Sequence, residues 1–293
     1  MSMYRLIGAG VFAAATAVIV LLGVLSDTGG RLLTRQFSVP VGEAGFAGLQ
    51  LHLGSAPTTI EVLPGGDTLL AASLTSRDDP RLLITDGGSS GAAQALRKSL
   101  VLEQAPEGKI SRESAAGPDE HWEISLSDRI PLDLEINVSQ GSLVADLADA
   151  RLASLVLSGG GKAVELTLPA STGDYGADID VGSARLEIRL SGTGEGGADR
   201  MLTLTAADDG LLLQVPGDIG LRLEGEIDAL ARLDAPPTLS DVPVPANECP
   251  IDQVERYRAQ ETAGFRTAVT RITVRVVEWR TGAFVLSAAG SQP

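Results

Sequence analysis

Cysteine, histidine and aromatic residues are all scarce in this sequence. Its 293 residues include one cysteine, Cys249, and two histidines, His52 and His121, and aromatic residues make up 3%. A single cysteine excludes a disulfide bond within the chain, so we interpret Cys249 as a loop thiol, with an intermolecular bridge as the alternative. A zinc site needs three or four suitably spaced ligands, so these residues predict no metal site. We expect no cofactor either.

Positive charge is also scarce. Lys and Arg number 23 against 38 Asp and Glu, which gives a formal net charge of -15. Such a surface repels the phosphates of nucleic acids, so the sequence predicts no nucleic-acid partner. Hydrophobic residues nevertheless make up 44%. A chain of this length and composition can bury a sizeable core, and the shortage of aromatic anchors favours thin, repeated layers.

One uncharged stretch stands at the amino-terminal end, from Leu6 to Leu25. About 20 apolar residues are enough to cross a bilayer as a helix, so we predict a transmembrane anchor here. Arg5 precedes the stretch and favours an N-in orientation, with the rest of the chain outside the cytoplasm. A cleaved secretory signal is the alternative, and it also exports everything after residue 27.

Apolar and polar residues alternate with a period of two from Trp122 to Pro169. This spacing is typical of strands with one buried and one solvated face. Comparable positions recur at intervals near 22 residues in two series: Leu134, Leu155, Ile179, Leu202 and Leu221, and Ala145, Leu166, Ile188 and Leu213. Two short strands per repeat predict an all-β fold, a β-solenoid-like stack that follows the transmembrane helix. An antiparallel β-sandwich is the alternative.

The alternation predicts a division of the chain into five parts. The parts are an anchor or signal (1–27), a linker (28–36), an extracytoplasmic β-repeat domain (37–233), a Pro-rich excursion (234–266) and terminal strands that pack on the β domain (267–290). Outside the apolar stretch we expect a short helix at Ala92–Leu100. One or two helical turns are also expected in the Pro-rich excursion, after Pro250.

Two short motifs match known catalytic or cofactor-binding patterns. Gly87–Gly91 fits G-x-S-x-G, with Ser89 as the nucleophile, but the only downstream histidine, His121, is expected to face outward from a strand. Gly192–Gly197 fits G-x-G-x-x-G, yet a strand rather than a helix is expected after it, so we interpret it as a corner between strands. We therefore predict no catalytic residues and no enzyme.

Three acidic residues cluster in one segment: Asp174, Asp178 and Asp180. Oxygen-rich turns can bind calcium, and an exported acidic protein would meet that ion. Asp178 and Asp180, however, alternate with Ile179 and Val181, as solvated outward positions do. We therefore predict surface carboxylates, with a calcium site as the alternative.

The strand motifs between Trp122 and Pro169 resemble those of bacterial toast-rack envelope domains and their relatives, the LiaF-like and putative adhesin (DUF4097-like) groups. The resemblance rests on a Trp-led strand, a P-L-x-L segment, a Gly turn and two L-x-L segments: Trp122, Pro131–Leu134, Gly141, Leu155–Gly161 and Val164–Pro169. It implies a non-catalytic extracytoplasmic β-solenoid, some relatives of which modulate envelope-stress signalling.

Residues and resemblance together give three hypotheses for the function. The first is a membrane-anchored extracytoplasmic module for interaction, adhesion or envelope-stress sensing, with an envelope protein or the cell wall as its partner. The second is an exported serine hydrolase that uses Ser89, and the third is a secreted, unanchored structural protein.

Overall fold

The computed structural model describes residues 32–77, 80–87, 96–104, 119–170, 173–182, 184–192, 197–205, 210–231, 233–234, 239–244, 256–278 and 284–289. Over these ranges the fold is all-β, with one short helix, α1 (Ile227–Leu230), which confirms the predicted class. The predicted anchor, Leu6–Leu25, lies outside the described residues. Within them, no helix has the length and apolar character needed to span a bilayer.

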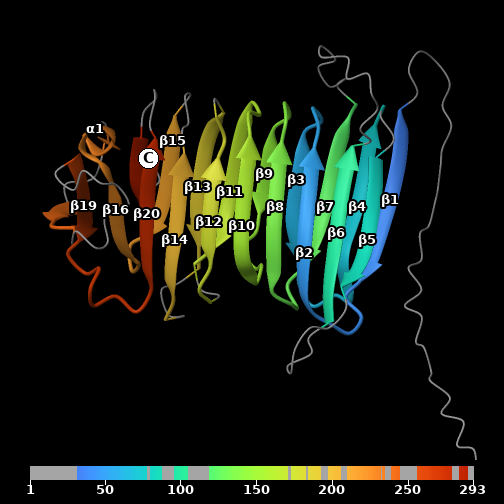
Figure 1. Cartoon of the computed structure of the whole chain (residues 1–293), viewed down its shortest axis with the longest axis horizontal. Coiled ribbons are helices and arrows are strands. Elements are labelled where there is room, and N and C mark those ends of the chain that lie inside the picture. Colours follow the sequence, from blue (N-terminus) through green and yellow to red (C-terminus); the bar gives the residue numbers. More distant parts are fainter. Residues whose placement is uncertain are drawn as a thin grey trace, which may run out of the picture.

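The described strands form two large sheets, which face each other and extend along the long axis of the molecule (Figure 1). The ten strands of the first sheet are, in spatial order, β1 (Leu33–Pro40), β4 (Thr68–Ser76), β7 (His121–Ser127), β3 (Thr58–Leu63), β9 (Leu143–Asp146), β11 (Ala163–Pro169), β13 (Arg185–Ser191), β15 (Leu211–Pro216), β21 (Phe284–Ala289) and β17 (Leu233–Asp234).

The second sheet has eleven described strands and runs in the same direction along the molecule. Starting at the end of the molecule where β1 lies, the spatial order of its strands is β5 (Pro80–Gly87), β6 (Leu96–Gln104), β2 (Ala44–Leu53), β8 (Leu132–Val138), β10 (Leu152–Gly159), β12 (Gly176–Asp180), β14 (Asp199–Thr205), β20 (Arg271–Glu278), β16 (Gly220–Glu226), β19 (Tyr257–Thr262) and β18 (Leu239–Val242).

Successive strands from β8 to β15 belong alternately to the two sheets. From β8 to β13, each pairs in parallel with the strand two places further along the chain, as β8 does with β10 and β9 with β11. Parallel pairing through this region excludes the alternative of an antiparallel β-sandwich for it. Antiparallel pairs occur toward the two ends of the sheets, between β1 and β4, β4 and β7, β5 and β6, β16 and β19, and β18 and β19.

The strand register confirms one of the two predicted series. Ala145, Leu166, Ile188 and Leu213 are successive register partners in the first sheet. The other series is wrong at its third and fifth members, because Leu155 pairs with Ala177 rather than Ile179, and Leu221 pairs with Ile272. In both sheets the partners from β8 or β9 onward differ by 21, 22 and 25 in residue number. Because the turns differ in length, the expected partner Ile179 is two residues away from the observed partner Ala177. A shift of two residues along a strand keeps the same face buried.

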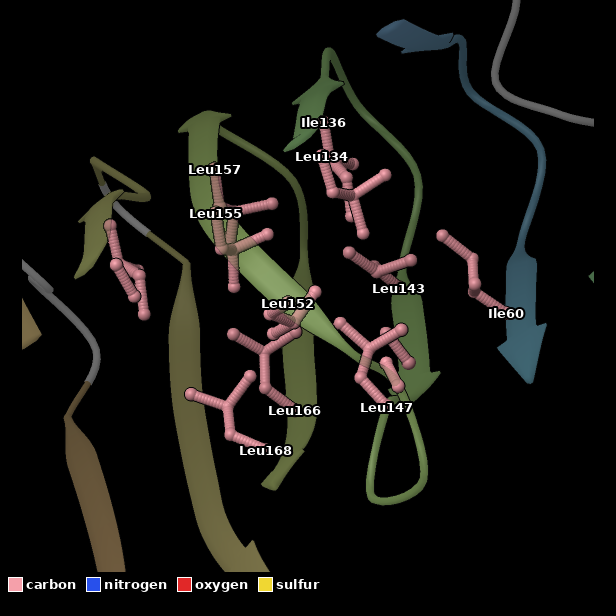
Figure 2. Packing of buried hydrophobic residues seen from close by; sticks show 14 of the residues in the cluster. Ile60, Leu134, Ile136, Leu143, Leu147, Leu152, Leu155, Leu157, Leu166 and Leu168 are labelled. Carbon is pink, nitrogen blue, oxygen red and sulfur yellow. The ribbon is translucent and has the colours of Figure 1, made fainter. Parts of the chain in front are cut away.

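The core lies between the sheets and consists mainly of aliphatic side chains. Leucines of β10 and β11 gather there, with neighbours from the adjoining strands (Figure 2). Leu155 and Leu166, on opposite sheets, are each 1% exposed. Each strand contributes one row of side chains, so burial of the core depends on neighbouring strands being stacked on both sides.

Three local expectations differ from the structure. Leu96–Leu100 belongs to β6 and not to a helix, because β6 pairs with β2 on one side and β5 on the other. The predicted Pro-rich excursion contributes strands to both sheets: β17 (233–234) to the first sheet, and β18 (239–242) and β19 (257–262) to the second. β1 begins at Leu33, inside the expected linker. The division into domains stays a prediction.

The last two strands of the chain, which we predicted to pack on the β domain, lie within the two sheets. β20 lies between β14 and β16, and β21 lies between β15 and β17. Along the chain, β16 and β17 precede β20 and β21. The later strands lie between these two earlier strands and β14 and β15. This arrangement joins the carboxyl-terminal strands to both sheets.

Candidate functional site

The two histidines lie where the alternation places them. His52 on β2 and His121 on β7 are both exposed. The Nδ1 atom of His121 lies 3.2 Å from the carbonyl oxygen of Asp119. The part of the chain that the structure describes contains no group of three or more His, Cys, Asp or Glu residues suited to a metal ion.

The acidic segment around β12 has a structural role in its turns. Asp178 and Asp180 are exposed, as predicted. A carboxylate oxygen of Asp174 accepts a hydrogen bond from the Asp199 amide at 2.9 Å, and one of Asp180 accepts from the Gly182 amide at 3.4 Å. The Asp180 carboxylate thus stabilises a local backbone turn, whereas the Asp174 carboxylate joins its segment to the first residue of β14.

The two motif matches have different outcomes. Ser89 lies outside the described residues, as does Cys249, so the predicted roles of these two side chains stay predictions. In the second motif, Gly192 and Gly197 have φ values of 114° and 64°, and strand β14 begins at Asp199. A dinucleotide fingerprint requires a helix after it, so the expectation that a strand follows this motif is confirmed, while residues 193–196 lie outside the described residues.

A hollow lies on the outer face of the first sheet, at the end formed by β1, β4, β7 and β3. Its volume is about 530 Å³, within the range of ligand pockets. We call it the β1–β3 groove; its lining residues are Gln36, Phe37, Ser38, Thr59, Glu61, Ala71, Ala72, Ser73, Glu123, Ile124 and Ser125.

The register of the four strands arranges the outward side chains of the groove in two rows. One row crosses the strands as Gln36, Ser73, Glu123 and Thr59. The other crosses them as Ser38, Ala71, Ser125 and Glu61. Residues separated by more than 80 positions in the sequence therefore form one continuous surface.

Side-chain size explains why this face is hollowed. Ala71 and Ser73 on β4 and Ser125 on β7 are small and half-buried, so they form a low floor. The longer side chains of Gln36 and Glu61 are exposed at the sides. A sheet face with short side chains in its middle strands leaves room for an added ligand without rearrangement of the backbone.

The groove carries negative charge. Among the described residues, its lining includes two carboxylates, Glu61 and Glu123, and no Lys, Arg or His. The hydroxyl of Ser125 donates a hydrogen bond to a carboxylate oxygen of Glu61 at 3.1 Å, which orients that side chain. Across the described residues, no ion pair involves either glutamate. Chemically, the groove can accept hydrogen bonds and attract a cation.

The opposite end of the molecule carries a second hollow beside a buried ionic network. This hollow, of about 340 Å³, is lined by Asp241, Val242, Pro243, Val244, Tyr257 and Arg258. Next to it, the carboxylate of Glu224, 5% exposed, lies 3.2 Å from Arg222 and 2.6 Å from Arg275. Burial, together with the charge of Glu224, raises the pKa of Tyr257 to about 12 despite Arg275. These groups join β16, β19 and β20, so we assign the network a structural role.

Sequence reasoning missed the β1–β3 groove. The segments that form it were recognised as strands, but nothing in them indicates which strands become neighbours. The available signal was the run of small outward residues on β4 and β7, Ala71, Ser73 and Ser125, on strands that otherwise alternate normally.

Comparisons with known proteins support the fold. Residues 34–193 match a family model described as the N-terminal domain of toast_rack, DUF2154. The comparison with curated proteins found no match. A solved structure of a "putative cell adhesion protein" from Clostridium sporogenes ATCC 15579 is similar, with a TM-score of 0.50 at 12% identity. The similarity covers 88% of this chain and 99% of that chain, and at this identity it shows the fold alone.

Proposed function

The chain belongs to the family of toast-rack N-terminal domains, and from this premise we propose that it is a non-catalytic interaction module held outside the cytoplasm by an N-terminal membrane anchor. Its body is then a β-solenoid that serves as a rigid support. The β1–β3 groove is the surface that contacts a partner in the cell envelope, in adhesion or in stress sensing.

One observation carries this proposal: a groove of about 530 Å³ on the outer face of a rigid stacked sheet. Surface hollows that are lined by polar groups and supported by regular strands are suited to recognition. The described residues that line the groove include no histidine or cysteine that could act as a base or nucleophile. Binding therefore explains this surface better than catalysis does.

The location can be tested in cells. We expect the intact chain in the membrane fraction, with its body digested by protease added to the outside. Val18→Arg together with Ile19→Arg places two charges in the apolar stretch and is expected to prevent anchoring, because central charges are costly in a bilayer. Intact wild-type protein in the cytosol would contradict the proposal. A mature chain that begins near Asp27 would indicate the secreted, unanchored alternative.

Contact through the groove can be tested by photo-crosslinking. A photoreactive amino acid at Ser73, on the groove floor, is expected to capture an envelope component that the same amino acid at Thr203 does not. Thr203 is a suitable control because it is half-buried on β14, in the other sheet. Equal capture at both positions would contradict the groove as the contact surface.

The serine hydrolase alternative has a direct test. G-x-S-x-G follows strand β5, as a nucleophile elbow requires, and Gly87 is the last residue of that strand. A fluorophosphonate probe is expected to leave the wild-type chain unlabelled. Labelling that disappears in Ser89→Ala would establish the hydrolase instead.

A further inference from the structure

We infer that the β1–β3 groove accepts an extended basic peptide segment of a partner protein, with one lysine or arginine side chain held between Glu61 and Glu123. This inference rests on the proposed role of the groove as the contact surface. It adds the chemical class of the partner and the two residues that select it.

Charge complementarity is the first argument. Glu61 and Glu123 are exposed, and among the described residues no cationic side chain lines the groove. Further along the same face the charges are mixed: Glu165 of β11 pairs in register with Glu187 of β13, but Glu187 forms an ion pair with Arg189. The negative charge is therefore concentrated at the groove, which repels an anionic ligand and attracts a cationic side chain.

The spacing of the two carboxylates is the second argument. Glu123 is opposite Thr59, and Glu61 is opposite Ser125, so the glutamates occupy diagonal positions on adjacent parallel strands. Strand spacing and residue rise place such Cα atoms about 8 Å apart. Each glutamate side chain extends about half that distance, so one ammonium or guanidinium group can contact both carboxylates. The hydrogen bond from Ser125 already orients Glu61 for this contact.

The floor of the groove favours a peptide over a carbohydrate. It offers hydroxyl groups from Ser38, Ser73 and Ser125 and the amide of Gln36, which can bond to the donors and acceptors of an extended backbone. Carbohydrate sites usually present an aromatic face, and the only aromatic residue that lines the groove, Phe37, is half-buried and packs against the core. A cationic amino-sugar polymer is therefore the less favoured ligand.

The test measures binding of a synthetic peptide to the detergent-solubilised full-length chain. The probe is a fluorescent ten-residue peptide of alternating lysine and threonine, and fluorescence anisotropy reports the Kd. We expect Glu61→Gln together with Glu123→Gln to raise the Kd by about tenfold or more, because charge-assisted hydrogen bonds are lost. Glu165→Gln, the same change on the same face outside the groove, is expected to change the Kd less than about twofold.

A second variant separates a built groove from an acidic surface. Ser73→Leu keeps both carboxylates but fills the floor between Gln36 and Glu123, and it is expected to weaken binding as much as the double variant. Unchanged far-ultraviolet circular dichroism and an unchanged melting temperature confirm that each variant is folded. An unaltered Kd in either groove variant overturns the inference, as does undetectable binding to the wild-type chain. Tighter binding of a chitosan oligomer than of the peptide overturns it in favour of an amino sugar.

The failure of this inference is distinguishable from failure of the proposed function. If crosslinking at Ser73 still captures an envelope component in the Glu61→Gln, Glu123→Gln background, the groove is a contact surface but does not select a cation. If the chain is cytosolic, the proposed function fails whatever the peptide binding shows.

Discussion

At the residue scale, a glycine fixes the turn after β10. Gly159 has a φ of 129°, and a Cβ atom there would lie 1.9 Å from the carbonyl oxygen of Val138 on the neighbouring strand. The amide of Gly160 donates to that same carbonyl at 3.1 Å. Neighbouring turns therefore stack through their backbones, and a side chain at Gly159 would separate them.

Gly159→Ala should destabilise the fold markedly. We expect a loss of about 2–4 kcal/mol in the free energy of unfolding, since both the φ value and the contact with Val138 are incompatible with a Cβ atom. Gly160→Ala is the matched control: nothing lies within 4 Å of its Cβ position, so the change should be within about 0.5 kcal/mol. Denaturant titration measures both values. Equal effects would contradict the stacked-turn geometry.

The buried Tyr257 predicts a dependence of stability on alkaline pH. Its pKa is raised from about 10 to about 12, so the folded state keeps the proton while the unfolded state releases it. The unfolded state then binds fewer protons, and stability falls as the pH rises from about 10 to about 12. Tyr257→Phe removes this contribution, so its stability should fall less steeply than that of the wild-type chain over the same interval. Parallel curves from urea titrations would contradict the assignment.

At the scale of elements, the ionic network joins the carboxyl-terminal strands to one another. Glu224 of β16 contacts Arg275 of β20, and Glu261 of β19 lies 3.3 Å from Arg222 of β16. Both carboxylates are nearly buried, with 5% and 7% exposure. The first pair joins β16 to β20, and the second joins β19, an antiparallel strand near the end of the sheet, to β16.

Glu224→Gln should weaken the junction between β16 and β20 strongly. Removing one partner of a buried ion pair leaves Arg275 without the charge of Glu224, at a cost of about 3–5 kcal/mol. Glu226→Gln on the same strand is the control, because Glu226 is 41% exposed and lies 3.4 Å from Arg256, and exposed pairs contribute about 0–1 kcal/mol. Hydrogen exchange should show faster exchange of the β20 amides in Glu224→Gln only. Unchanged exchange there would contradict the role of the network.

Element prediction succeeded where alternation was regular and failed where tertiary pairing overrode local preference. Leu132–Val138 alternates strictly, and β8 has these same bounds. Leu96–Leu100 contains good helix formers, yet it lies between β2 and β5, where its backbone groups complete two ladders. Those hydrogen bonds depend on segments distant in sequence, so local propensity could not reveal them.

At the scale of the whole molecule, the insertion of β20 and β21 makes the carboxyl-terminal segment integral to the stack. Val274 of β20 pairs with Leu202 of β14 on one side and with Leu223 of β16 on the other. Val274 is fully buried. Without this segment, β14 and β16 would lose the strand that joins them in the second sheet, and β15 and β17 would lose theirs in the first sheet.

Deletion of residues 271–293 should therefore abolish cooperative unfolding, although it removes a terminus. The loss exposes the paired edges of β14 and β16 and the core beneath them, and free edges favour association. Deletion of residues 1–31 is the control, because it removes no described strand, and it should leave the melting temperature unchanged within a few degrees. Circular dichroism and size-exclusion chromatography give the two readouts. A cooperative, monomeric transition in the 271–293 deletion would contradict this role.

The sequence by itself determined the all-β class and the buried face of most strands, because a period of two directs alternate side chains to opposite faces. It also determined the family, through the strand motifs from Trp122 to Pro169. The tertiary structure alone decided that Ala177 rather than Ile179 aligns with Leu155, that β20 enters between β14 and β16, and that Glu61 and Glu123 share a groove. The physical reason is that backbone hydrogen bonds between strands are nearly independent of side-chain identity. Alternation therefore fixes which face is buried, while the choice of neighbour and register depends on the packing of the whole stack.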